Sequence, residues 1–232
     1  MPKKSSPAAK TRAPLTRERI LRAAISFADE SGLEALSMRR LATSLGVEAM
    51  SLYNHVANKE DILDGIADLV LGEIDVSSGR AGWKLAMRRR AMSVHEVLVR
   101  HPWASVVIES RTGLGPVRLN YAESMLRVLR EGGFPVESAH AAILLLDSYI
   151  YGFVLQVKSW PHQGMDGPSL VEQMSKRVPA DQYPNLSETM RFIMQPGARR
   201  TSSAPNALPY QAEFEFGLEV ILDGLERVRN KG

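Results

Sequence analysis

The sequence predicts an all-helical protein, with a small helix-turn-helix unit near the N-terminus and a larger helical domain after it. Apolar residues recur at spacings of three and four through most of the 232 residues, whereas the alternation typical of strands is scarce. Gly and Pro stand mainly between these periodic segments. The length allows one or two domains, and 44% hydrophobic residues are enough for a sizeable core.

The first quarter of the chain predicts an arm followed by four short helices. Residues 1–14 contain Lys and Pro but no apolar stretch, which is typical of a flexible basic arm. Thr16 is a suitable N-cap for a first helix, and Gly32 is a suitable end. The other three are expected from Ser37 to Gly46, over Glu48–Val56, and from a cap at Asn58 and Asp61 onward. We therefore expect a small helical domain at residues 15–75.

Residues 76–232 predict the larger domain. Its helical segments are Trp83–Arg100, Ala104–Glu109, Pro116–Glu131, Val136–Trp160, Ser169–Arg177, Leu186–Met194 and Tyr210–Arg229, with loops at Pro161–Pro168 and Pro196–Pro209. Val136–Trp160 is apolar nearly all round, so it needs contacts on more than one side. It is short of apolar residues for a membrane span and carries Asp147, so we expect a buried helix. Together with Tyr210–Arg229 it predicts a twofold four-helix interface and hence a homodimer.

The charge is concentrated at the N-terminal end. Residues 1–57 carry nine Lys and Arg against five acidic residues, a net charge of +4, whereas the whole chain has +3. This distribution favours an anionic partner at that end, although the basic arm itself is compatible with a solvated tail. The Arg88–Arg90 run is expected to be mainly a solvated helix face. The absence of Cys excludes disulfides and thiolate chemistry, and with no signal peptide visible we expect a cytoplasmic location.

The stretch from Ser37 to Tyr53 predicts a helix-turn-helix. Ala42 is small where two helices would meet, Gly46 tolerates a positive φ in the turn, and Leu52 can fix the angle from the second helix. The residues then left on the exposed part of the second helix are Glu48, Ala49, Met50, Ser51, Tyr53 and Asn54. Small and apolar side chains suit thymine methyl groups, and Arg39 can reach a guanine edge. The alternative is a purely structural helical hairpin.

The residues Leu52-Tyr53-Asn54-His55-Val56-Ala57-Asn58-Lys59-Glu60-Asp61-Ile62-Leu63 resemble the signature of the TetR family of transcriptional regulators. The resemblance covers about Thr16–Leu71. The remainder looks like the tetracycline-repressor type of C-terminal domain, through Arg100–Trp103, Gly132–Phe134 and the apolar helix that follows. The family implies an all-helical homodimer with one DNA-reading head and one ligand pocket per subunit.

This resemblance also implies roles for individual residues. Base-facing or groove-lining positions fall on Arg39, Ala49, Met50 and Tyr53, and phosphate-facing positions fall on Ser37, His55 and Lys59. Each has a plainer alternative: Tyr53 can cap the small core, and His55 can be a buried, hydrogen-bonded imidazole.

Candidate ligand contacts lie in the larger domain. Asp147 shares a helix face with Leu144, Tyr151 and Leu155, so this acid needs a partner, and the alternatives are Tyr151, His140, a basic residue of another helix or a ligand. Further aromatic, thioether and polar candidates are Trp103, Arg111, Tyr121, Met125, Tyr151 and Trp160, each of which can equally be plain core. In tetracycline-binding members, histidines help hold a magnesium–drug complex, and two of them align with Asp75 and Arg111. We therefore do not expect tetracycline itself.

Catalysis has little support in the sequence. The five histidines form no metal-spaced pair, and no nucleophile elbow or phosphate loop is present. We expect no enzyme activity, no cofactor and no metal. The expected function is a repressor that binds a palindromic double-stranded DNA operator as a dimer and is released by a small-molecule effector. The alternatives are an activator, a ligand-independent repressor or a helical interaction scaffold.

Overall fold

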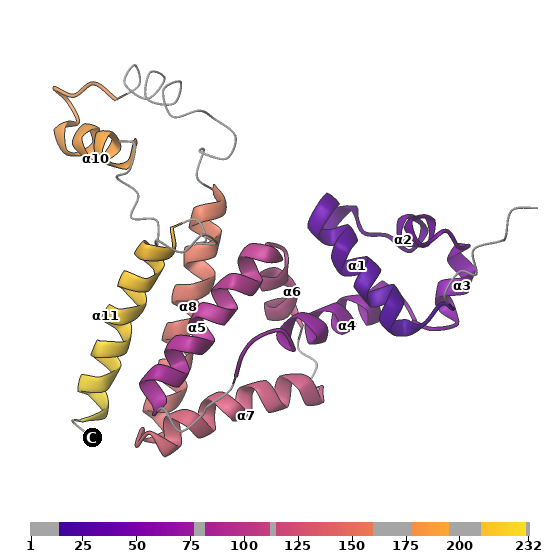
Figure 1. Ribbon diagram of the computed structural model, residues 1–232, viewed down its shortest axis with the longest axis horizontal. Helices are drawn as coiled ribbons and strands as arrows, with labels where there is room; N and C mark the ends of the chain where they lie inside the picture. Colours follow the sequence, from indigo (N-terminus) through magenta and orange to yellow (C-terminus); the bar gives the residue numbers. More distant parts are fainter. Residues whose placement is uncertain (1–13, 77–81, 112–114, 160–177, 195–209, 231–232) are drawn as a thin grey trace, which may run out of the picture. The chain divides into compact units, whose positions relative to one another are not determined.

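A computed structural model describes residues 14–76, 82–111, 115–159, 178–194 and 210–230. All regular elements within these ranges are helices, and none is a strand, which confirms the predicted fold class. The chain divides into two compact units, residues 1–69 and 70–232. Each is described by itself below (Figure 1).

The described part of the first unit, from residue 14 onward, consists of four α-helices and one short 3₁₀ turn. These are α1 (Arg17–Ser31), η1 (Leu33–Ala35), α2 (Met38–Leu45), α3 (Ala49–Tyr53) and α4 (Lys59–Leu71), whose last residues cross into the second unit. The predicted caps are confirmed, since Thr16 Oγ1 accepts the Arg19 N–H at 3.2 Å and Gly32 has φ of 79°. The 3₁₀ turn was not predicted.

Helix α3 is shorter than the segment Glu48–Val56 that the sequence predicts. The N–H groups of His55 and Val56 both donate to the Leu52 carbonyl, at 2.9 and 3.0 Å, so the helix closes in a turn after Tyr53. The next helix then begins, because Asn58 Oδ1 accepts the Asp61 N–H at 2.9 Å. Helix α3 is therefore only five residues long.

The second unit is a helical bundle. Its described helices are α5 (Trp83–Arg100), α6 (Ala104–Ser110), α7 (Pro116–Glu131), α8 (Val136–Ser159), α10 (Pro184–Met194) and α11 (Gln211–Arg229). Helices α5 and α8 pack against each other, and each also contacts α7 and α11. These bounds agree with the predicted ones to within a residue or two. The predicted helix Ser169–Arg177 and the predicted loops Pro161–Pro168 and Pro196–Pro209 lie outside the described residues.

Helix α8 is buried on one face only. Residues 136–157 are long and apolar enough to cross a membrane by length and composition, but such a window is also typical of bundle helices. Ala142, Leu146 and Ile150 are fully buried in the bundle, whereas Leu144, Leu145 and Leu155 are exposed. Helix α11 likewise exposes Phe216, Val220 and Val228. One face of α8 therefore packs within the subunit, and the other carries exposed apolar side chains. Whether a second subunit covers this second face, as the sequence predicts, stays a prediction.

Candidate DNA-reading surface and ligand site

A tight turn between α2 and α3 sets the angle of the two helices. Gly46 adopts the left-handed conformation, with φ of 67° and ψ of 36°, which an L-residue with a side chain rarely adopts. Its N–H donates to the Thr43 carbonyl, and the Val47 N–H donates to the Ala42 carbonyl, each at 3.0 Å. This closes α2 in a Schellman-type cap. Ala42 and Leu52 are buried at the junction, as the helix-turn-helix prediction requires.

The opposite side of α3 faces solvent. Met50 is 72% exposed and Tyr53 is 46% exposed, which is uncommon for side chains of this size. Ala49 and Ser51 are half-buried, between this surface and the junction with α2. Tyr53 is therefore not part of the buried core of the first unit. The arrangement presents a short helix with apolar and hydroxyl groups on its accessible face.

The residues expected to face phosphates surround this helix in sequence. Ser37 is the N-cap of α2, where its Oγ accepts the Arg40 N–H at 3.3 Å, and Arg39 is exposed in the first turn. His55 is exposed, so it is not a buried, hydrogen-bonded imidazole. Lys59 is the first residue of α4. Ser37 and Lys59 thus both lie at helix N-termini, where backbone N–H groups also attract anions.

An ion pair holds the beginning of α4. Arg17 donates from Nη1 to Asp61 Oδ2 at 2.8 Å and from Nη2 to Asp61 Oδ1 at 2.6 Å. Asp61 Oδ2 also accepts the Ala57 N–H at 2.9 Å. The hydrogen bond from Arg17 is the main cause that lowers the pKa of Asp61, so the carboxylate stays ionised. Sequence reasoning found Asp61 as a cap but not its partner on α1.

The second unit contains a buried arginine. Arg90 is 1% exposed, and its Nε and Nη2 donate to the Tyr121 hydroxyl at 3.0 and 2.6 Å. Nη2 also donates to Asp147 Oδ1 at 2.6 Å. The expectation that the Arg88–Arg90 run is a solvated face is therefore wrong for Arg90. The four-three-four spacing of Trp83, Met87, Arg90 and Val94 places Arg90 on the buried side of α5, and this spacing is readable in the sequence.

Arg90 gives Asp147 the partner that the sequence requires. Of the alternatives considered, the basic residue of another helix is the one found, because Arg90 lies on α5 and Asp147 on α8. Tyr151 lies near the same group: burial raises its pKa, and the charges of Asp147 and Arg90 act on it in opposite directions. Three of the predicted ligand candidates, Tyr121, Asp147 and Tyr151, are thus brought together around one residue that was not predicted.

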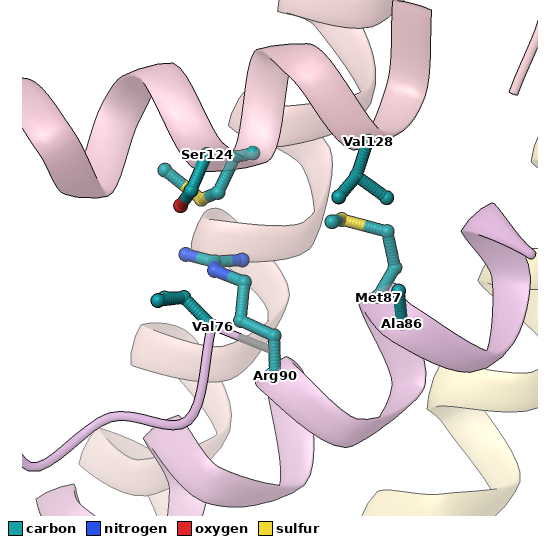
Figure 2. A pocket seen from close by; sticks show the side chains of 7 residues that line it. Val76, Ala86, Met87, Arg90, Ser124 and Val128 are labelled. Carbon is teal, nitrogen blue, oxygen red and sulfur yellow. The ribbon is translucent and has the colours of Figure 1, made fainter. Parts of the chain in front are cut away.

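A small cavity adjoins Arg90 (Figure 2). It measures about 10 Å³, which is room for one water molecule. Its lining consists of Val76, Ala86, Met87, Arg90, Ser124, Met125 and Val128. Met125 was among the predicted candidates. Met87 and Ser124 were missed because single apolar or hydroxyl residues on a helix carry no signal that distinguishes a cavity from the core.

Two other predicted ligand candidates, Trp103 and Arg111, are not part of the lining of this cavity. Trp103 is buried at the start of α6, with its ring 5.8 Å from that of His101. Arg111 follows α6, and its carbonyl accepts a hydrogen bond from Arg118 at 2.8 Å. Trp160 lies outside the described residues. Within the described ranges, no group of three or more His, Asp or Glu side chains is placed to hold a metal ion.

Two family comparisons agree with this architecture. Residues 20–66 match the bacterial regulatory proteins of the tetR family, and residues 77–229 match the tetracyclin repressor-like C-terminal domain. The chain belongs to the TetR family. This family consists of transcriptional regulators rather than enzymes, in agreement with the sequence-based expectation.

Several TetR-family proteins are similar over most of the chain. The HTH-type transcriptional repressor DrrR1 of Streptomyces coeruleorubidus is 31% identical over 214 residues, 91% of this chain and 77% of DrrR1. The tetracycline repressor protein class D of Escherichia coli is 31% identical over 164 residues, 68% of this chain and 74% of that protein. The crystal structure of the TetR-family protein ActR from Streptomyces coelicolor, in complex with (S)-DNPA, is 31% identical with a TM-score of 0.70, covering 93% of this chain and 98% of ActR.

Proposed function

We propose that the protein is a cytoplasmic repressor that binds a palindromic operator as a homodimer and is released by a small-molecule effector. Residues 15–75 would bind DNA, and residues 76–232 would bind the effector and form the dimer. The observation that carries this proposal is the exposed face of α3, which a buried junction with α2 presents to solvent. DrrR1, a relative over most of the chain, is named as a repressor.

The exposed face of α3 is suited to the major groove of DNA. Met50 and Ala49 can contact thymine methyl groups, while the hydroxyl groups of Ser51 and Tyr53 can bond to base edges or to the backbone. Arg39 would reach a guanine edge from α2. Ser37, His55 and Lys59 would contact phosphates on either side and so fix the register of the helix without reading sequence.

The uncovered apolar faces of α8 and α11 support a homodimer. Helix α11 exposes Phe216, Val220 and Val228 at four- and eight-residue spacings, and Gly224 falls between them on the same face. A Cβ at Gly224 would meet no atom within 4 Å in the part of the subunit that the structure describes. The same is true of Gly152 on α8, between the exposed residues Leu145 and Leu155. A second copy of the chain that packs here would cover both faces. Its helices could approach α11 and α8 closely at Gly224 and Gly152, where no side chain stands in the way.

Release from DNA requires that an effector bound to residues 76–232 alters the DNA-binding unit. Helix α4 supplies residues to both units, because the boundary falls between Leu69 and Val70. Just beyond α4, Glu73 accepts a hydrogen bond from Arg100 at the end of α5 at 2.5 Å. A ligand that shifts α5 would therefore act on α4 and change the separation of the two recognition helices. The free energy would come from the difference in ligand affinity between the two states.

Selection of bound sequences from random DNA, followed by a reporter placed behind the selected site, tests this function. We expect an inverted repeat whose half-sites lie about 34–36 Å apart, one helical turn. Deleting the gene should raise reporter expression if the protein represses. A fall in expression would instead show an activator, and the absence of any enriched site would favour a helical interaction scaffold.

A further inference from the structure

The guanidinium of Arg90 is not fully satisfied by the residues around it. Nε and Nη2 share the Tyr121 hydroxyl and the Asp147 carboxylate, but Nη1 is buried and has no hydrogen-bond partner among the residues that the structure describes. Leaving a charged donor buried and unpaired is strongly unfavourable, because the group loses its hydrogen bonds to water and gains none in the protein. A group with both of its N–H bonds unused is therefore expected to have a function or an exchangeable partner.

Arg90 also borders the cavity described above. In Figure 2 its guanidinium extends from α5 toward Ser124 on α7. Two thioether side chains, Met87 and Met125, form part of the wall. Methionine adapts its shape readily and makes favourable contacts with aromatic rings, so this wall can yield to a flat ligand larger than the present cavity.

The balance of charge around Arg90 favours an anionic oxygen as the missing partner. The Arg90 side chain is 2% exposed, whereas that of Asp147 is 22% exposed, so solvent screens the carboxylate more than the guanidinium. Hydrogen bonds from a guanidinium to an ionised oxygen are roughly twice as strong as neutral ones. A ligand anion would add to the partial compensation that Asp147 supplies.

We propose that the effector is a flat apolar molecule bearing a carboxylate or another acidic oxygen, which accepts hydrogen bonds from Arg90 Nη1 while the apolar part lies against Met87 and Met125. This inference rests on the proposed function, of which it names the ligand class. Since the existing partners of Arg90 lie on α7 and α8, the ligand would act where three helices meet.

The test uses three pairs of probes, each an acid and its neutral carboxamide: benzoate, 2-naphthoate and anthraquinone-2-carboxylate. Binding to the full chain is measured by calorimetry without DNA. We expect at least one acid to bind about tenfold more tightly than its carboxamide. Arg90→Gln should abolish this preference, and Arg89→Gln, an exposed neighbour on the same helix, should keep it. Equal binding within all three pairs, or a preference that survives Arg90→Gln, would overturn the proposal.

A second variant covers the case in which Arg90→Gln does not fold. Asp147→Asn keeps an oxygen for Arg90 but removes the competing charge, so acid binding should tighten several-fold while carboxamide binding stays the same. Unchanged or weaker acid binding would contradict the proposal. Operator affinity of the ligand-free protein is measured separately. If the wild-type protein binds its operator but does not prefer the acids, only the ligand class is rejected. If the wild-type protein binds no operator, the proposed function is rejected.

Discussion

The imidazole of His95 stacks on the ring of Phe214, with centroids 4.1 Å apart and planes 10° from parallel. Phe153 packs edge-on against the same imidazole at 5.7 Å, so α5, α8 and α11 meet at one aromatic cluster. His95 is 1% exposed, and within the described ranges neither ring nitrogen has a hydrogen-bond partner. Burial therefore lowers the pKa of His95 to about 4, and the bundle forms around a neutral imidazole.

Acid should weaken the bundle through His95. The unfolded chain takes up a proton near pH 6.5, whereas the folded chain resists it until about pH 4, so the unfolded state binds more protons between these values. The free energy of unfolding should be unaffected above pH 6.5 and should fall by up to about 1.4 kcal/mol per pH unit on the way to pH 4. Urea denaturation from pH 7.5 to 4.5 measures this fall.

His95→Phe provides the matching variant, since a phenyl ring fits an aromatic stack and does not titrate. It should flatten the pH dependence in this range, whereas His140→Gln, at an exposed position, should leave it unchanged. If His95→Phe retains the full wild-type slope, the neutral-imidazole account is wrong.

Arg17 and Asp61 should stabilise the DNA-binding unit only modestly. Both side chains are partly exposed, at 44% and 27%, so a double-mutant cycle with Arg17→Gln and Asp61→Asn should give a coupling of about 0.2–1 kcal/mol. Because the pKa of Asp61 is lowered, this coupling should be present at neutral pH and be lost only as pH falls below the ordinary value of 3.8. It should also shrink in 1 M salt. A coupling that is unchanged by salt would contradict a partly solvated ion pair.

Lys59 and Met50 should affect DNA binding in different ways. Lys59→Ala should weaken binding to all sequences alike and reduce the magnitude of the salt slope by about 1, because one phosphate contact is lost. Changing Met50 or Ala49 should instead alter sequence preference by roughly 1–3 kcal/mol per affected base pair. Fluorescence anisotropy over a salt series on the operator and its single-base variants separates the two effects. An unchanged preference after both positions are recoded would reject the groove assignment.

Gly224 tests the dimer surface without disturbing the subunit. Its Cβ position is open in the subunit, so Gly224→Arg should leave the fold intact but bury a charge in the proposed interface. We expect the dimer dissociation constant, measured by analytical ultracentrifugation, to rise at least about a hundredfold. Leu119→Arg, at an exposed position on α7, is the control and should leave dimerisation unchanged. A Gly224→Arg dimer as tight as the wild type would place the interface elsewhere.

The sequence predicts the fold well wherever a local signal marks a helix end. Thr16 and Asn58 are caps with short side chains that accept a backbone N–H, and Gly46 holds a positive φ, so each boundary depends on neighbours in the chain. The length of α3 was overestimated because its end depends on where the next helix begins. Periodicity alone does not reveal such competition between adjacent turns.

The candidate ligand site around Arg90 is predicted only in part from the sequence, because its central residue is paired through contacts distant in sequence. The position of Asp147 on an apolar helix face predicts that it has a partner. Arg90 is harder to identify as that partner, because it is the last of three consecutive arginines, which are typical of a solvated helix face. Arg88 pairs with Glu215 and Glu219 on α11, while Arg90 turns inward two residues later. The spacing of Arg90 from Trp83, Met87 and Val94 indicates in the sequence which arginine is buried, whereas its pairing with Asp147 depends on the packing of α5 against α8.

The affinity of the protein for its selected operator, compared with scrambled DNA of equal length across a salt series, tests the central claim most directly. A sequence-reading repressor should bind the operator at least about a thousandfold more tightly, with both affinities falling as salt rises. Equal affinity for the two DNAs would show that the exposed face of α3 does not read sequence and would contradict the account.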